Sequence, residues 1–209
     1  MDLNQEKILV DLAKKNPEAF GILFDEYYPK ILGYSIKRTG DIHLAEDITA
    51  ETFCKAQRKL WQFKWQGVPF SAWLYRIATN EINYYFRTKK RLNSISLEAL
   101  TADGNIQFAD QYNLVEELQK AEDEIARHKM FLRIKSEIDK LPIKYQEVIA
   151  LRFFENKTIP EISQILDKKE GTIKSLLSRG IERLRVITEE QMQPSPQKVI
   201  IKGERSINN

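Results

Sequence analysis

The sequence has little cysteine, histidine, glycine or proline, and each shortage excludes something. Cys54 is the single cysteine among 209 residues, so an internal disulfide is excluded, which fits a reducing compartment. His43 and His128 lie far apart in the sequence. With one cysteine they make a transition-metal site unexpected, and we expect no cofactor. No apolar run approaches the roughly 18 to 20 residues needed to cross a bilayer, and the N-terminus starts acidic without a long apolar core. We therefore expect a cytoplasmic protein without a signal peptide or membrane insertion.

What remains is a chain with the composition of a globular helical protein. It is 42% hydrophobic and 30% charged, and alternating strand patterns are scarce. We expect an all-α fold made of two small helical domains. The net charge of +3 is small, but it is unevenly distributed along the chain. Residues 61–91 hold six Lys or Arg and one acid, whereas residues 98–124 hold eight acids and one Lys. Basic segments separated by an acidic one indicate two parts that face a polyanion, joined by a connector.

The helical periodicity divides the chain into four parts. The first domain is expected over residues 1–91, with a helix start at Asn16-Pro17-Glu18, a turn at Thr39-Gly40-Asp41 and a helix from about His43 to Trp61. A flexible acidic linker is expected over residues 92–120, and a second helical domain over residues 121–187. The tail, residues 188–209, contains two prolines and no helical period, so we expect it to be disordered.

The second domain contains a helix-turn-helix pattern. Thr158 and Glu161 form a capping box for a short helix, and the three residues KKE separate it from GTIKSLLSRGIERLR. The apolar positions of the second helix fall on one stripe: Ile173, Leu176, Leu177, Gly180, Ile181 and Leu184. Its opposite face carries four positive charges and one negative charge, which favours insertion into the major groove of DNA. A plain helical hairpin with a solvated charged face is the alternative, at about even odds on spacing alone.

The last helix of the first domain, residues 70–91, carries a different polar surface. Its apolar face includes Phe70, Leu74, Ala78 and Ile82. Opposite it run Arg76, Asn80, Asn83 and Arg87, flanked by Trp73 and Tyr84. We call these six residues the polar strip. Cations beside aromatic rings suit unpaired DNA, because charge follows the backbone and rings stack on bases. The alternative is that the rings are half-buried core residues. Glu81 lies near the middle of the apolar face, where a carboxylate has no evident role.

The second domain resembles the C-terminal promoter-binding domain of the extracytoplasmic-function (ECF) sigma factors of the sigma-70 family. The resemblance lies in LPIKYQEVIALRFFENKTIPEISQILDKKEGTIKSLLSRGIERLR. It implies that the second helix reads the −35 promoter element. The residues implied are Thr172, Lys174, Ser175, Ser178, Arg179 and Arg183. Two positions depart from the family pattern: Lys169 stands where a capping Ser is usual, and Leu176 where Arg is usual.

The first domain resembles the N-terminal domain of the same family in NPEAFGILFDEYYPKILGYSIKR, AEDITAETF and AWLYRIATN. That domain melts the −10 element and docks on RNA polymerase core. The resemblance implies docking of Asp47 and Glu51 on the β′ coiled coil, and contact of the chain with the β flap. The implied −10 contacts are the polar strip and a base-capturing loop with Phe63, Lys64 and Trp65. Ala50, where Gln is common, and Tyr84, where Asp is frequent, depart from the family pattern.

These features together predict a promoter-specificity subunit of bacterial RNA polymerase that directs core enzyme to −35/−10 promoters and promotes DNA melting. The family resemblance also implies an anti-sigma partner. The alternative is a stand-alone helix-turn-helix regulator that does not dock on polymerase. An enzyme is not expected: a recombinase nucleophile at Tyr84 or Tyr85 has no nearby histidine, and no phosphate loop or acidic metal cluster appears.

Overall fold

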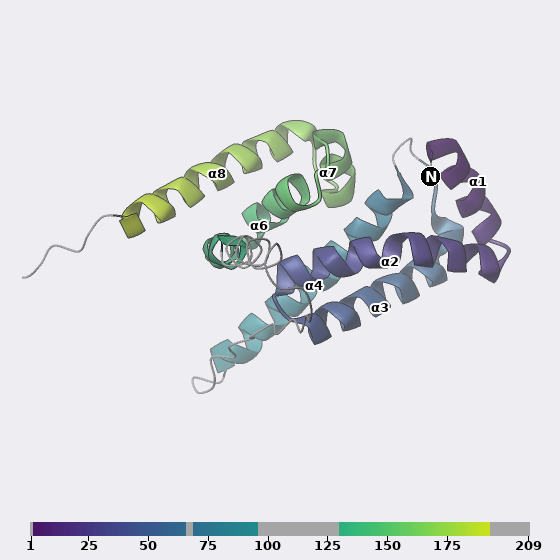
Figure 1. The fold of residues 1–209 in the computed structure, drawn as a ribbon, viewed down its shortest axis with the longest axis horizontal. Coiled ribbons are helices and arrows are strands. Elements are labelled where there is room, and N and C mark those ends of the chain that lie inside the picture. The colour runs from purple at the N-terminus through teal and green to yellow at the C-terminus, as the bar shows by residue number, and fades with distance from the viewer. Residues whose placement is uncertain (1, 66–68, 96–129, 193–209) are drawn as a thin grey trace, which may run out of the picture.

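The computed structural model describes residues 2–65, 69–95 and 130–192 (Figure 1). Within these ranges every regular element is a helix and no β-strand occurs. The all-α fold expected from the sequence is therefore confirmed. The acidic segment between residues 96 and 129 and the tail from residue 193 lie outside the described residues, so the expectations of a flexible linker and a disordered tail remain predictions.

The N-terminal unit consists of α1 (Leu3–Ala13), α2 (Pro17–Thr39), α3 (Ile42–Lys59), the short η1 (Leu60–Gln62) and α4 (Phe70–Ile95). The long helices α2, α3 and α4 pack against one another (Figure 1). As predicted, the Asn16 side chain caps α2, which begins with Pro17. The helix ends at Gly40, whose φ of 71° is a left-handed conformation that glycine adopts without strain.

The helix α3 shows how the apolar stripe positions this unit. Ile48, Thr52 and Ala56 are buried, and the Thr52 hydroxyl donates to the Ile48 carbonyl oxygen at 2.7 Å, so its polarity is satisfied. α3 begins one residue earlier and ends two residues earlier than the predicted helix from His43 to Trp61. The opposite face of α3 is left to solvent.

The sequence analysis did not assign α1. Asp2 caps this helix through a capping box with Gln5. Buried Glu6 accepts a short hydrogen bond from the Tyr27 hydroxyl of α2. Three large apolar side chains of α1, Leu3, Ile8 and Leu12, are exposed. The apolar periodicity of α1 is therefore a weak signal of packing.

The C-terminal unit begins with a helical segment at residues 130–139. It continues with α6 (Ile143–Ile149), a single π-helical stretch (Ala150–Phe154), α7 (Ile159–Leu166) and α8 (Glu170–Met192). The capping box of Thr158 and Glu161 is present at the start of α7, as predicted. α8 crosses α6 closely: a Cβ at Gly180 would lie 3.0 Å from Cδ1 of Ile149, so glycine lets the two helices approach.

The two units are in contact. α7 packs beside α4, and the π-helical stretch packs beside α2 (Figure 1). This contact involves the polar strip, which lies on α4 and is called the α4 strip from here on.

Candidate nucleic-acid interface

The outer face of α8 is open along its first turns. Thr172, Lys174, Ser175, Ser178, Arg179 and Arg183 are all exposed. The guanidinium of Arg183 lies 5.2 Å from the centre of the Tyr145 ring, a cation–π contact with α6. The other five side chains face solvent along one side of α8. A helix that enters a major groove needs such an open side.

The inner face of α8 anchors this surface. Ile173, Leu177 and Gly180 are buried, in agreement with the expected stripe. Ile181 is an exception: 47% of its surface is exposed, although Leu184 and Ile187 further along α8 pack against the core. At the start of α8 the position before Glu170 is Lys169, whose side chain has no acceptor for a capping bond. Its carbonyl oxygen instead accepts from the backbone amides of Thr172 and Ile173.

The α4 strip is partly open and partly covered. Asn80, Tyr84 and Arg87 are exposed. Arg76 and Asn83, by contrast, point at the C-terminal unit. Arg76 donates to a carboxylate oxygen of Asp167 at 2.9 Å, and the amide nitrogen of Asn83 donates to a carboxylate oxygen of Glu147 at 2.9 Å. In this arrangement two of the four polar groups of the strip are bonded to the C-terminal unit.

The aromatic residues lie together at the start of α4. The ring of Phe63 is 5.1 Å from that of Trp73, 5.3 Å from that of Phe70 and 6.4 Å from that of Trp65. Phe63, Trp65 and Trp73 are half-buried and pack on the core, so each ring is both a core residue and part of a surface. The alternative of half-buried core rings is therefore confirmed for Phe63, Trp65 and Trp73, while stacking on unpaired DNA remains a prediction.

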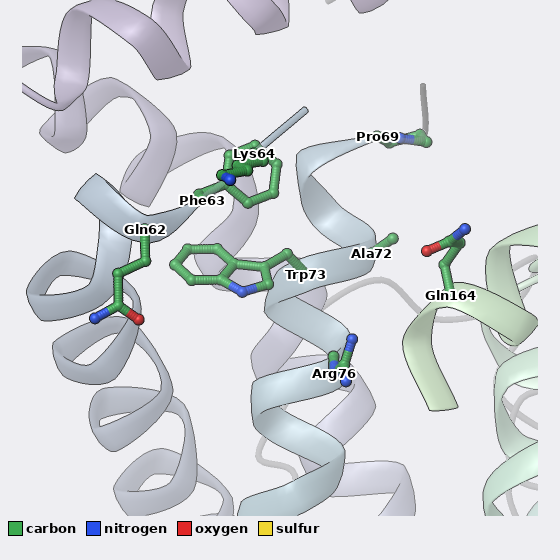
Figure 2. A pocket seen from close by; sticks show the side chains of 8 residues that line it. All are labelled: Gln62, Phe63, Lys64, Pro69, Ala72, Trp73, Arg76 and Gln164. Atoms are coloured by element: carbon green, nitrogen blue, oxygen red, sulfur yellow. The ribbon is translucent and has the colours of Figure 1, made fainter. Parts of the chain in front are cut away.

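A pocket of about 240 Å³ opens beside these rings (Figure 2). Phe63, Lys64, Trp73 and Arg76 line it, as does Gln164, which approaches from α7 of the C-terminal unit. Lys64 is exposed at its edge. Gln62 and Gln164 also line the pocket and were not predicted as site residues, because uncharged glutamines in separate segments carry no local pattern. The loop, α4 and α7 together bring two aromatic rings, two cations and two amide groups to one hollow.

A buried polar network joins the two units beside the strip. The Glu155 carboxylate accepts from the Lys37 ammonium at 2.9 Å and from the Tyr75 hydroxyl at 2.7 Å. Burial, followed by the charge of Glu155, raises the pKa of the Tyr75 hydroxyl well above its usual value. Lys157 lies 4.6 Å from the centre of the Tyr75 ring. The contact between the units is therefore polar, with carboxylates on the C-terminal side.

The exposed face of α3 carries the expected docking residues. Asp47 is exposed and Glu51 is half-buried. Lys55 pairs with Glu51 at 3.2 Å and with Glu81 of α4 at 2.6 Å. The hydrogen bond to Glu81 raises the pKa of Lys55. The acid on the apolar face of α4 is thereby explained: Glu81 ties α4 to α3, a long-range contact that helical periodicity does not reveal.

Within the described residues, no cluster of three or more His, Cys, Asp or Glu side chains is arranged to hold a metal ion. None of the helices in those same ranges is long and apolar enough to cross a membrane.

Two family models match the chain in the order that the sequence predicted. Residues 23–92 match Sigma-70 region 2, and residues 131–184 match Sigma-70, region 4. The first match contains α3 and the α4 strip, and the second contains α6, α7 and the first turns of α8. The fold and the two surfaces therefore define a sigma-70-type protein that carries regions 2 and 4.

Comparison with curated relatives identifies the class of sigma-70-type protein. The chain is 32% identical over 185 residues to the ECF RNA polymerase sigma factor SigW of Bacillus subtilis, covering 88% of this chain and 97% of SigW. It is 31% identical over 168 residues to the ECF RNA polymerase sigma factor BldN of Streptomyces coelicolor, covering 80% of this chain and 59% of BldN. The chain belongs to the ECF RNA polymerase sigma factors, the subunits that direct core polymerase to promoter DNA.

Solved structures agree with the fold. CnrH, solved in complex with the cytosolic domain of CnrY, superimposes with a TM-score of 0.61 at 21% identity, covering 88% of this chain and 97% of CnrH. RpoE of Bartonella quintana, solved with the anti-sigma factor NepR, gives a TM-score of 0.59 at 24% identity, covering 81% of this chain and 96% of RpoE.

Proposed function

We propose that the outer face of α8 recognises the −35 element of a promoter, and that the α4 strip together with the Phe63–Trp65 loop holds the unpaired −10 strand. The two regions match the duplex and single-stranded parts of an open promoter. The observation that carries this proposal is the fully exposed polar face of α8, which is fixed from below by buried Ile173 and Leu177. Lys174 and Arg179 would meet phosphates or base edges, with Thr172, Ser175, Ser178 and Arg183 beside them.

The pocket beside Trp73 suits a base that has left the DNA stack. Lifting a base out of the duplex costs a few kcal/mol, and stacking on an aromatic ring recovers about 1–3 kcal/mol. Phe63 and Trp73 supply rings, while Lys64 and Arg76 supply charge for the adjoining phosphates. Two positions depart from the family pattern, Lys169 and Leu176, and both weaken −35 contacts without changing the fold.

We also propose that Asp47 and Glu51 dock on the β′ coiled coil of core polymerase, that the C-terminal unit meets the β flap, and that an anti-sigma factor sequesters the chain in the cytoplasm. The solved complexes of CnrH and of RpoE support a partner of that kind. Bond formation in RNA belongs to the core enzyme, so the chain itself is not a catalyst. The domain boundaries that we propose are 1–91, 92–120, 121–187 and 188–209.

The test is run-off transcription with cognate core polymerase on a pool of random promoters, with and without the full chain. Transcripts that depend on the chain and share two upstream motifs are expected. Selection of a duplex site by a chain that does not bind core would instead support the stand-alone regulator, which the family membership does not favour.

A further inference from the structure

The last turn of α2 carries an arginine that has no partner. Arg38 is only 3% exposed, and its Nε, Nη1 and Nη2 atoms are all buried without a hydrogen bond to any residue that the structure describes. A guanidinium stays charged at any physiological pH, and burying a charge without a partner is strongly unfavourable. The burial of Arg38 is therefore not compensated by any hydrogen bond within those residues.

The register of α2 against α4 places Arg38 beside the strip. The two helices run side by side in the same direction, because the ring of Tyr27 lies near that of Phe70 and the ring of Tyr34 lies near that of Tyr75. The Tyr34 hydroxyl lies 2.9 Å from the Thr79 hydroxyl. Arg38 is one turn after Tyr34, and Asn83 is one turn after Thr79, so these two side chains stand at the same level.

Asn83 is also incompletely bonded. Its amide nitrogen donates to Glu147, but its Oδ1 atom is buried with no partner in the described part of the chain. Unsatisfied donors of Arg38 and an unsatisfied acceptor of Asn83 therefore lie at the same level of two adjacent helices. The groups that the C-terminal unit bonds at this level are acidic, because Glu147 bonds Asn83 and Glu155 bonds Lys37, the residue before Arg38.

A carboxylate and a phosphate offer the same kind of acceptor, an anionic oxygen that binds guanidinium through charged hydrogen bonds. We propose that Arg38 and Asn83 form a binding site for a phosphate of the unpaired DNA strand, and that Glu147 covers this site while the two units are in contact. The inference rests on the proposed function and adds Arg38 to the residues that hold the strand. Separation of the units frees the guanidinium beside Asn80, Asn83 and Arg87, where the strand backbone passes.

The test uses holoenzyme assembled from cognate core and the full chain. The probe is a labelled fork-junction DNA with a single-stranded −10 segment, taken from a promoter selected by the native chain. Arg38→Met removes the charge at similar volume, and Arg38→Lys keeps it. Arg133→Met is the matched control, because Arg133 is exposed.

Arg38→Met is expected to weaken binding about tenfold or more, the usual effect of losing a charged hydrogen bond. It should also reduce the slope of log affinity against log salt by about 0.7, the contribution of one phosphate on a single strand. Arg38→Lys should restore the slope, and Arg133→Met should change neither quantity. The free chain carrying Arg38→Met should unfold at or above the native temperature, because an unpaired buried charge has been removed.

Unchanged affinity and salt slope in the Arg38→Met holoenzyme would overturn the inference, and so would a lower unfolding temperature with unchanged affinity, which indicates a structural role. If native holoenzyme does not bind the fork, the proposed function itself has failed. The two failures are thus distinguishable.

Discussion

The two surfaces proposed to bind promoter DNA differ in how far they are exposed. On α8 all six proposed −35 residues reach solvent. On α4, Asn80, Tyr84 and Arg87 reach solvent while Arg76 and Asn83 bond carboxylates of the C-terminal unit. A helix that reads duplex DNA can thus be presented while the units are together, but the surface for the unpaired strand is complete only when they separate. We expect recognition of the duplex element to be independent of that separation.

The largest expected effect concerns two positions in the apolar stripe of α8. Ile173 is fully buried, so Ile173→Ala should lower the free energy of unfolding by about 2–5 kcal/mol through lost burial and a residual cavity. Ile181, eight residues later on the same helix, is 47% exposed, and Ile181→Ala is the matched control with an expected loss below about 1 kcal/mol. Urea unfolding of the free chain measures both. Equal losses of unfolding free energy in the two variants would contradict the burial of Ile173 and the exposure of Ile181.

The sequence predicts the elements that depend on local signals. The Asn16-Pro17 start, the Gly40 end and the Thr158–Glu161 capping box are each contained within a few residues, and the structure has all three. The buried stripe of α3 also follows, because a spacing of four places its members on one face. The prediction for Ile181 was wrong: the buried side of α8 runs from Ile173 and Leu177 to partly buried Leu184 and Ile187, and Ile181 is exposed at the edge of the apolar stripe.

The parts that the sequence did not predict depend on residues far apart in the chain. Glu147 is 64 residues from Asn83, and Asp167 is 91 residues from Arg76. Periodicity assigns Arg76 and Asn83 to the polar face of α4 correctly, but it carries no information about what packs there. The absence of a partner for Arg38 is likewise a property of the assembled contact between the units, where Lys37 is bonded and Arg38 is not.

Loosening the contact between the units should affect the two surfaces unequally. Glu155 is nearly buried and bonds both Lys37 and Tyr75, so Glu155→Gln should destabilise the contact by about 1–3 kcal/mol. We expect the free chain to bind a single-stranded −10 oligonucleotide more tightly, by about tenfold, while its affinity for a −35 duplex is unchanged. Fluorescence anisotropy with each DNA measures this, and exposed Glu18→Gln is the control. A parallel gain for both DNAs would refute the unequal exposure.

Alkaline pH should weaken the same contact. The pKa of Tyr75 is raised in the folded chain, so the hydroxyl stays protonated there after it has begun to ionise in the unfolded chain. Its contribution to stability is therefore complete below about pH 10 and is lost as the pH rises, at up to about 1.4 kcal/mol per pH unit. Tyr75→Phe should make the decline of the unfolding free energy between pH 9 and 11 shallower. Tyr27 and Tyr34, whose pKa values are also raised by burial, remain in both proteins. An identical decline in native chain and variant would exclude the titration of Tyr75.

The smallest expected effect is at the exposed end of the contact. Asp167 and Arg76 pair at 2.9 Å, but their side chains are 78% and 42% exposed, and such surface pairs contribute about 0–1 kcal/mol. Asp167→Asn removes the charge while keeping a residue type that tolerates its left-handed φ of 54°. Single-strand affinity of the free chain should rise at most about fivefold at low salt, and the gain should vanish near 1 M salt, where surface charges are screened. A gain larger than that of Glu155→Gln would mean that Arg76, not the buried network, controls access to the strip.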